Sequence, residues 1–455
     1  MYNLKKLKYM ILILLAILAL PLAASEEDSE SGFPFTFDIN LGLGFDSFED
    51  DPDGDGTTEP IGYNKLTLGP DFGIGPFGIG FELTFHFIFQ NNELTVRQED
   101  WVPEEVTFLN VLELYLSKFR YIRYGHMGDP LYAKFGSIED GLLGNGFIMG
   151  YYANTLFLPE KRVLGLQFNL DGDFFGFPLF GIETFAGNVV KPDVLGARIY
   201  FRPLLSLNIP IISVMQTGIS VATDINPDAY LEDREINDDV TFYDFDVQLP
   251  LISNAIVSLA VFGDMGTYKF KSIGGMLGFG GNLISFFNYG AQMRFIGDGF
   301  IPTYFDMTYD ITRGADYDNI ERTGNNVSPG YMGWLAYIGT GIEGLFNLRI
   351  SLDGPIGEVE PGALENPANY LHLTGMLTIY ENIIPGFSID GIYDKAFITD
   401  ATELFSLENA FILGKLNYRM GTAIISLLYQ VTYNPDNPEG EELSITSGLE
   451  TTISF

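Results

Sequence analysis

The sequence predicts an all-β fold, a single antiparallel transmembrane β-barrel over residues 33–455. Three observations lead to this prediction: long runs of alternating apolar and polar residues, connections of two distinct lengths, and a composition with 39 Phe, 25 Tyr and 52 Gly. Successive side chains of a strand point to opposite faces, so such runs form a sheet with one apolar and one polar face. At roughly 22 to 25 residues per strand with its connection, we expect about 16 to 20 strands, with 18 as the central value.

Residues 1–24 are predicted to be a cleaved signal peptide. Lys5, Lys6 and Lys8 precede an apolar stretch that begins at Met10, and Ala24 stands directly before a run of acidic residues. A transmembrane anchor is the alternative, but the apolar stretch is shorter than the ~20 residues that a spanning helix needs. Cleavage would leave a short acidic tail, residues 25–32, before the first strand.

The alternating runs are long. The longest extends from Phe77 to Gln90, where Ile88 alone breaks the pattern. Further two-faced runs occupy residues 195–202, 243–251, 303–312, 346–353 and 443–455. A β-sandwich would also alternate, but it seldom needs such spans repeatedly, whereas a strand that crosses a membrane needs ~9 to 11 residues.

The connections support a barrel with two different ends. Short turns are expected at Gly75-Pro76, Glu343-Gly344 and Arg419-Met420. Long connections rich in acidic residues are expected at 49–61, 91–105, 226–239, 314–330, 354–369 and 434–442. In transmembrane barrels the short turns are periplasmic and the long loops extracellular. Between residues 255 and 302, a glycine-rich stretch makes the strand count uncertain by one.

The last run, from Leu443 to Phe455, alternates to the end of the chain. In this it resembles bacterial outer-membrane β-barrel proteins of the porin-like class, whose final strand commonly ends in a Phe that the insertion machinery reads. The resemblance is to the class, and no specific family is assigned. It implies a location in the bacterial outer membrane, with lipid, lipopolysaccharide and the barrel-assembly machinery as partners, and Phe455 as the insertion signal.

One region does not fit a plain alternation of strand and loop. Basic residues are frequent between Lys118 and Arg162, and the segment 136–159 within that region is apolar and interrupted by glycine. A segment too apolar for an exposed loop and too interrupted for a strand is expected to fold inward as a constriction or plug. The alternative is a short strand pair with a surface helix, its basic residues lying at lipid head groups.

Fixed charges at a narrow point select among solutes. The arginines expected to line the constriction are Arg120, Arg123, Arg198 and Arg202. The acidic residues expected to oppose them in the lumen are Asp244, Asp246, Asp306 and Asp310.

A calcium site is a second candidate. Asp51, Asp53 and Asp55 alternate in the first long connection, with Glu59 nearby, and alternate oxygen ligands can surround one hard cation. The motif is incomplete, because Gly62 stands where a full loop would place a bidentate Glu. The alternative is a solvated acidic loop. No other cofactor is expected.

Several functions are disfavoured by composition. The chain has no Cys and three His, which excludes disulfides and leaves few combinations for metal or nucleophile chemistry, so we do not expect an enzyme. A formal charge of −36 repels nucleic acid.

The function favoured is a channel for passive diffusion of small hydrophilic solutes. The alternative is a plugged barrel that transports an apolar substrate or acts as a surface-exposed binding or structural protein. The solute is not predicted, and a homo-oligomer remains open because lipid-facing and subunit-facing strands have the same pattern.

Overall fold

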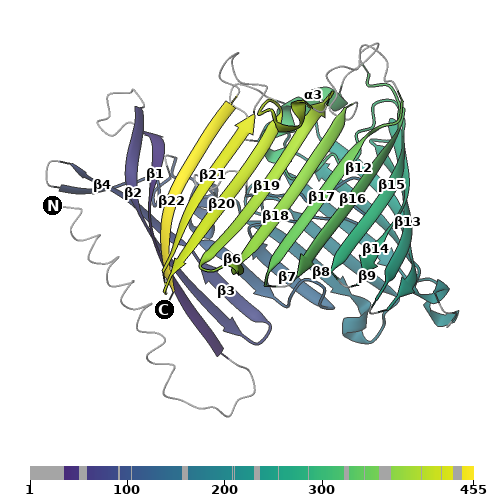
Figure 1. Cartoon of the computed structure of the whole chain (residues 1–455), viewed down its shortest axis with the longest axis horizontal. Coiled ribbons are helices and arrows are strands. Elements are labelled where there is room, and N and C mark those ends of the chain that lie inside the picture. The colour runs from purple at the N-terminus through teal and green to yellow at the C-terminus, as the bar shows by residue number, and fades with distance from the viewer. Residues whose placement is uncertain are drawn as a thin grey trace.

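A computed structural model describes residues 35–454 except 51–58, 91–92, 104, 156–161, 208, 210, 230–235, 255, 285, 322–326, 343, 358–369, 401, 422 and 434–442. Its 22 strands form one sheet that curls into a barrel (Figure 1). The predicted signal peptide and acidic tail lie outside the described residues.

The strands of the first half are β1 (Phe35–Asp50), β2 (Glu59–Ile74), β3 (Phe77–Phe81), β4 (Leu83–Gln90), β5 (Glu93–Val96), β6 (Phe119–Tyr124), β7 (Leu131–Gly136), β8 (Gly165–Asp171), β9 (Phe180–Ala186), β10 (Val194–Phe201) and β11 (Gln216–Asp224). Those of the second half are β12 (Val240–Ser253), β13 (Ser258–Tyr268), β14 (Ser272–Leu283), β15 (Phe287–Ile296), β16 (Tyr331–Ile342), β17 (Phe346–Pro355), β18 (Leu371–Ile384), β19 (Phe387–Ile398), β20 (Ala410–Met420), β21 (Ala423–Tyr433) and β22 (Leu443–Ser454).

Antiparallel pairing joins these strands into a closed ring. From β6 to β22 each strand pairs with the next, β22 pairs back with β1, and β1 pairs with β2. β2 pairs with both β3 and β4, and β3 pairs with β6. Among the described strands β5 pairs with β4 alone, so 20 strands make up the ring. The predicted all-β barrel is confirmed, but its central value of 18 strands is wrong.

The error in strand number has two sources. β6 to β9 contain only six or seven residues each, fewer than the assumed strand length. Three strands, β13 to β15, occupy the glycine-rich stretch between residues 255 and 302. Glycine has no side chain, so alternation is hard to detect there.

The connections alternate between the two ends of the barrel, as antiparallel pairing requires. β1, β11, β15, β17 and β21 end at the upper end of the barrel in Figure 1, and β2, β16, β18 and β20 end at the lower end. The lower end also carries longer connections after β8 and β10, which contain short 3-10 helices. In the second half the longer intervals between strands therefore fall at the upper end, except for the three residues between β13 and β14, which are also at that end.

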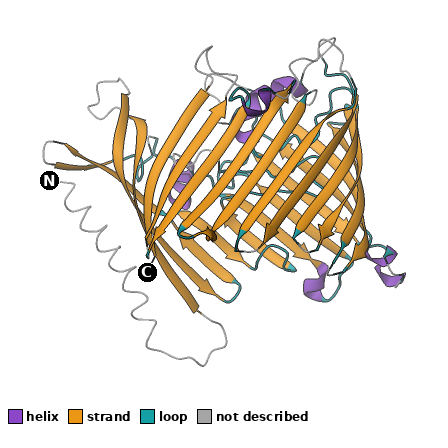
Figure 2. Cartoon of the chain, in the orientation of Figure 1, coloured by secondary structure: helices purple, strands orange, loops and turns teal. Residues whose placement is uncertain are grey.

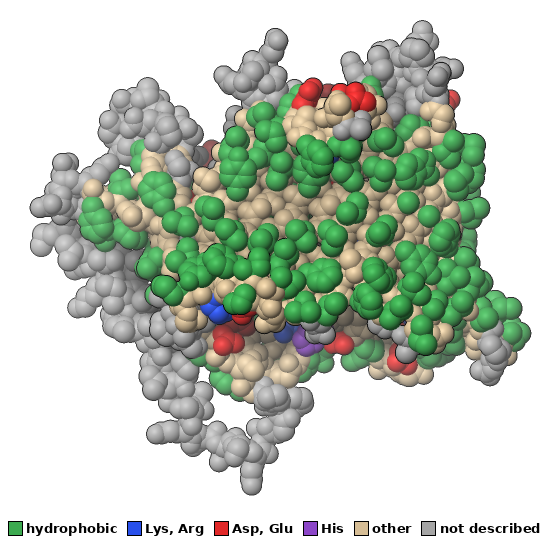
Figure 3. Space-filling model, viewed as in Figure 1, with side chains coloured by type: hydrophobic (Ala, Val, Ile, Leu, Met, Phe, Trp, Pro, Cys, Tyr) green, Lys and Arg blue, Asp and Glu red, His purple; other side chains and the backbone are tan. Residues whose placement is uncertain are grey.

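The two faces of the wall differ in polarity. In β10, Ile199 and Phe201 are exposed and Arg198 is buried, and in β12, Phe245 is exposed and Asp246 is buried. Figure 3 shows hydrophobic side chains over much of the visible wall, with acidic side chains gathered near its rims. At these positions the outer face is apolar and the inner face polar.

Two predicted strands differ from the structure. The run from Phe77 to Gln90 is divided at Glu82, whose backbone N–H donates to Lys118 O at 2.8 Å instead of continuing the ladder. Residues 303–312 do not form a strand: residues 303–308 are irregular and a helix begins at Tyr309. The predicted long connection at 314–330 is accordingly helical as far as Ile320.

Among the described residues the helices are few (Figure 2). They are α2 (Phe108–Leu116), α3 (Tyr309–Ile320) and the 3-10 helices η1 (Gly172–Phe175), η2 (Leu205–Leu207), η3 (Ile212–Val214) and η6 (Glu403–Phe405). Within the described part of the chain, none of them is long and apolar enough to cross a membrane.

Candidate functional site

The polar interior of the barrel is the candidate site, and its first part is a paired charge cluster on β8 to β12. Arg198 donates to the Asp246 carboxylate from Nε and Nη2 at 2.8 and 2.7 Å, and to Glu183 from Nη1 at 3.2 Å. Just below it, Arg202 Nη2 donates to Asp171 Oδ2 at 2.6 Å. Each arginine is therefore neutralised by a neighbour on the same wall.

Arg120 and Arg123 lie on β6, near the seam at which β22 pairs with β1 and closes the ring. The pairing of β3 with β6 slips between Gly80 and Phe81, so Arg120 is the extra residue of a bulge. A bulge re-aims its side chain, and Arg120 turns inward to bind Asp71. Arg123 donates to Gly125 O at 3.1 Å and lies over the ring of Tyr121.

A segment between β7 and β8 fills part of the interior. Residues 137–155, hereafter the insert, pack against inner-face residues of β9 to β15 and against residues 300–309. The buried side chains of this core include Ile138, Leu143, Phe147, Ile148, Met149 and Tyr152 from the insert, and Phe185, Phe242, Met276, Phe300 and Phe305 around it. Apolar residues on this part of the inner wall are thus covered by the insert. Residues 156–159 of the segment expected to fold inward lie outside the described residues.

The insert is a hairpin whose tip needs glycine. Gly141 and Tyr152 form an antiparallel bridge, and Thr303 N–H donates to Phe147 O at 2.7 Å. At the tip, Gly144 has a φ of +56°, and a Cβ there would lie 3.1 Å from Asp246 Oδ2. Asn145 then donates to Asp264 Oδ2 at 2.9 Å. The insert is thereby tied to the acidic inner face of β12 and β13.

Asp306 and Asp310 do not line a strand. The Asp306 carboxylate accepts from the backbone N–H and the hydroxyl of Thr308, at 2.8 and 2.9 Å. Such a side-chain bond to the backbone two residues on favours a turn and the start of a helix over an extended chain. α3 follows at once and carries Asp310 into the buried core.

A fully buried arginine connects α3 to the wall. Arg313 is 0% exposed, and its guanidinium lies 2.7 Å from Asp310, 3.2 Å from Asp193 and 3.4 Å from Asp224. Tyr152 of the insert donates to Asp310 at 2.9 Å. Burial raises the pKa of Asp193 to about 6, and burial likewise raises the pKa of Asp310. One cation thus holds three carboxylates from three segments of the chain.

Acidification is expected to stabilise this cluster. Burial raises the pKa of Asp193 from an ordinary 3.8 to about 6, so between these values the folded protein binds more protons than the unfolded chain. The resulting contribution to stability is complete below pH 4 and is lost as the pH rises through 6. For Asp193 alone, lowering the pH from 7 to 5 should raise the free energy of unfolding by about 1 kcal/mol.

The measurement is the unfolding midpoint at each pH, taken as the difference between wild type and Asp193→Asn. That difference should depend on pH between 4 and 7, and a pH-independent difference would contradict the expectation. Asp238→Asn, which changes an exposed carboxyl, is the control.

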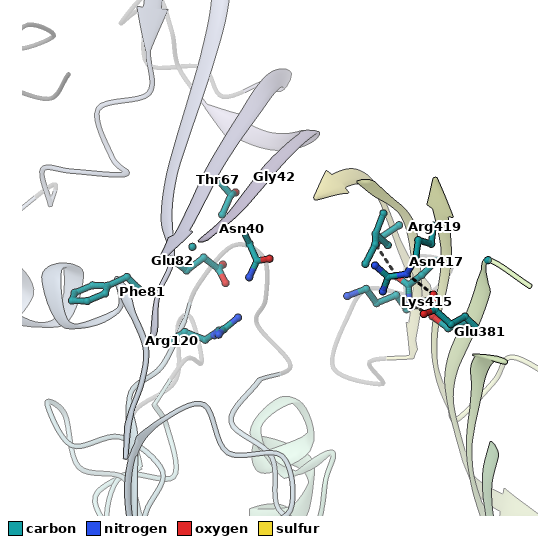
Figure 4. Close-up of a pocket in the computed structure, with 15 residues that line it drawn as sticks. Asn40, Gly42, Thr67, Phe81, Glu82, Arg120, Glu381, Lys415, Asn417 and Arg419 are labelled. Carbon is teal, nitrogen blue, oxygen red and sulfur yellow. Dashed lines mark hydrogen bonds and ion pairs between the residues drawn. The ribbon is translucent and has the colours of Figure 1, made fainter. Parts of the chain in front are cut away.

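The half of the interior nearest the seam is not filled by the insert. A cavity of ≈ 310 Å³ lies between β1, β2, β6 and β18 to β21, and a second of ≈ 620 Å³ lies between β1, β2, β4 and α2. In Figure 4, Asn40, Glu82 and Arg120 face Lys415, Asn417 and Arg419 across the first cavity. Arg419 Nε is 2.5 Å from Glu381 Oε2. The lining is polar and carries both signs of charge.

Two predicted sites cannot be placed. Asp51, Asp53 and Asp55 lie outside the described residues, and Glu59 is described only as the first residue of β2. The described residues contain no cluster of three His, Cys, Asp or Glu that could hold a metal ion. Phe455, the predicted insertion signal, also lies outside the described residues.

Some interior residues had no distinct sequence signal. Arg313 lies in a stretch whose sequence predicts no regular strand. Lys415 lies in a predicted strand, where only its alternation with Leu416 indicates an inward-facing side chain. The alternation could have identified Lys415, whereas the depth of Arg313 depends on the fold of α3.

The fold and site define a barrel with an apolar exterior and a charged, partly filled interior. No protein-family model matches the sequence, and no curated protein matches it either. Among solved structures, OpdL of Pseudomonas aeruginosa aligns over 93% of this chain and 98% of its own at 10% identity and a TM-score of 0.33. P. aeruginosa OccK10 (OpdN) aligns over 92% of this chain and 99% of its own, at 9% identity and a TM-score of 0.34. A BenF-like porin from Pseudomonas fluorescens aligns over 92% of this chain and 98% of its own, at 8% identity and a TM-score of 0.30. Values this low assign neither a family nor an activity.

Proposed function

We propose that the protein is an outer-membrane channel that lets small hydrophilic solutes diffuse passively through the seam side of its interior. The observation that carries the proposal is the polar cavity of Figure 4, enclosed by a wall whose outer face is apolar. An apolar exterior suits lipid, because a barrel satisfies its backbone hydrogen bonds internally. The predicted signal peptide and the alternating last strand support export to the outer membrane.

Selectivity is proposed to arise at the first cavity. The chain as a whole is strongly acidic, but the lining of this cavity contains more cations than carboxylates. The cations are Arg120, Lys415 and Arg419, and the carboxylates are Glu82 and Glu381. Arg120 and Arg419 have carboxylate partners, while among the described residues no ion pair involves Lys415. The charge of Lys415 is therefore the one most available to a passing ion. We propose a weakly selective path.

The experiment is single-channel conductance of the refolded mature protein in a planar bilayer. Steady conductance with a reversal potential near zero in a KCl gradient is expected. A correctly folded but silent barrel would overturn the proposal and favour a plugged transporter or a surface-binding protein.

Lys415→Ser should make the channel more cation-selective. Removing a fixed positive charge from the cavity lowers the local anion concentration, and the permeability ratio of K⁺ to Cl⁻ should rise about twofold. Reversal potentials in a KCl gradient measure this ratio. Lys271→Ser removes the same charge from an exposed connection at the upper end and should leave the ratio unchanged. An equal shift in both variants would place the selective step outside the cavity.

A further inference from the structure

The seam between β1 and β22 is only partly paired. The register runs from Asn40↔Ser454 to Phe45↔Leu449 and stops. Beyond it, β1 continues to Asp50 in register with β2, and β22 extends back to Leu443 in register with β21. Among the described residues, neither continuation has a partner across the seam. Figure 1 shows the two strands diverging toward the upper end.

The sheet on the other side of β1 is also detached at its outer edge. β4 pairs with β2 and β5, but β5 has no second partner among the described strands, and β6 pairs with β3 below the break at Glu82. The upper parts of β1 and β2, together with β4 and β5, therefore form a flap that, among the described strands, is paired with the rest of the ring only at its base. In Figure 1 this flap leans away from the wall.

The flap has its own internal packing. Phe48, Tyr63 and Ile88 form a small buried cluster on its inner face. Beside them, His86 lies 3.0 Å from Asp46 and 2.9 Å from Asp100. Ile88 is the residue that breaks the alternation of its run, and its place in this cluster explains the exception. These contacts hold the strands of the flap together and join them to the segment between β5 and α2.

Behind the flap lies the cavity of ≈ 620 Å³. Asp46, the first residue of β1 beyond the paired stretch, lines it, so the gap in the seam adjoins the cavity. Cations and carboxylates occur in nearly equal number on its walls, and Lys191 is 2.7 Å from Glu113, as Arg162 is from Glu82. A ligand group bearing both charges can exchange with both partners of such pairs.

The rim of the gap is apolar on the outside. Phe45, Leu443, Ile445 and Leu449 are exposed there, with exposed fractions of 44–58%. A molecule that lies across the gap would contact hydrocarbon-like side chains outside and paired charges inside. That combination describes an amphiphile.

We propose that the unpaired seam is a lateral opening through which a single-chain amphiphile with a zwitterionic head group enters the cavity behind the flap. The head group would bind among the charge pairs, and the chain would lie between the unpaired edges of β1 and β22. This proposal shares the membrane location with the proposed channel but does not need the channel to conduct.

The chain has no Cys, so introduced cysteines report on the seam alone. Extending the register beyond Phe45↔Leu449 would place Ser47 opposite Ser447, while Leu43 is already paired with Thr451. The test pair is Ser47→Cys with Ser447→Cys, and the matched control is Leu43→Cys with Thr451→Cys. A flexible bis-maleimide joins each pair in the refolded protein in vesicles. The readouts are transfer of a fluorescent-chain lysophosphatidylcholine to the protein and single-channel conductance.

The control pair should form a disulfide spontaneously, and the test pair should not. Cross-linking the test pair should remove most of the lysophosphatidylcholine transfer and leave conductance unchanged, while the cross-linked control keeps both. A fluorescent monoacylglycerol, which lacks the charged head, should transfer more slowly than the lysophosphatidylcholine.

Three results would overturn the proposal. They are a spontaneous disulfide in the test pair as fast as in the control, transfer that is absent or insensitive to the cross-link, and cross-links between two molecules, which would mean that the free edges pair with a second copy. If the wild-type protein transferred the lysophosphatidylcholine but did not conduct, the proposed channel would be refuted and the lateral opening would still be supported.

Discussion

Replacing residues 138–163 with a two-residue Asn-Gly turn should raise the single-channel conductance about twofold, because the insert fills the half of a wide lumen that faces β9 to β15. The wall should tolerate the change, since Gly136 and Gly165 are directly paired across β7 and β8 and a tight turn can join adjacent strands. The insert lies inside the barrel, against the inner face and residues 300–309, so the outer surface is unaltered. Conductance in a planar bilayer measures the effect.

A matched control separates loss of the insert from loss of its anchor. Asn145→Ala removes one hydrogen bond to Asp264 and leaves the buried apolar side chains in place. We expect its conductance to remain near that of wild type. If the deletion variant folds and conducts no better than wild type, ions do not pass through the part of the lumen that the insert occupies.

Arg313→Met should be the most destabilising single substitution in the interior. It leaves the buried carboxylates of Asp193, Asp224 and Asp310 without their shared cation, and breaking a buried ion pair from one side costs about 3–5 kcal/mol. The barrel wall has its own hydrogen bonds, so the loss should appear first in α3 and the insert. Limited proteolysis at α3 and the urea midpoint are the measurements.

A double variant tests whether the uncompensated carboxylate charges cause the loss of stability. The double variant with Arg313→Met and Asp310→Asn removes one of the three carboxylate charges and should recover part of the lost stability. Lys271→Met, at an exposed position near the same end, should have little effect. If Arg313→Met were no worse than Lys271→Met, the buried carboxylates would have to be protonated without their partner.

The wall was predictable because a physical constraint imposes it. A strand between lipid-like surroundings and a polar interior must alternate, and β10 and β12 do so in the positions expected from Arg198 and Asp244. The signal weakens where strands are short, as in β6 to β9, or rich in glycine, as in β14. Those are the places where the strand number was wrong.

The interior was less predictable because its pattern is ambiguous. Phe305 and Tyr309 fit alternation, but as residues four apart they also fit one side of a helical turn. The capping hydrogen bonds of Asp306 favour the second arrangement, and packing of both rings around the insert completes it. A single sequence does not show that Tyr152 and Arg313 meet at Asp310.

The uneven placement of the buried core has a consequence for local stability. The insert and α3 brace the wall from β9 to β16, whereas the flap and the six residue pairs of the seam carry no such backing. Regions with few buried contacts open with smaller free energies than the rest of a structure. Amide hydrogen exchange should therefore be fastest in β1, β4, β5 and the first half of β22, and slowest in β11 to β14, so one barrel would contain a rigid side and a yielding side.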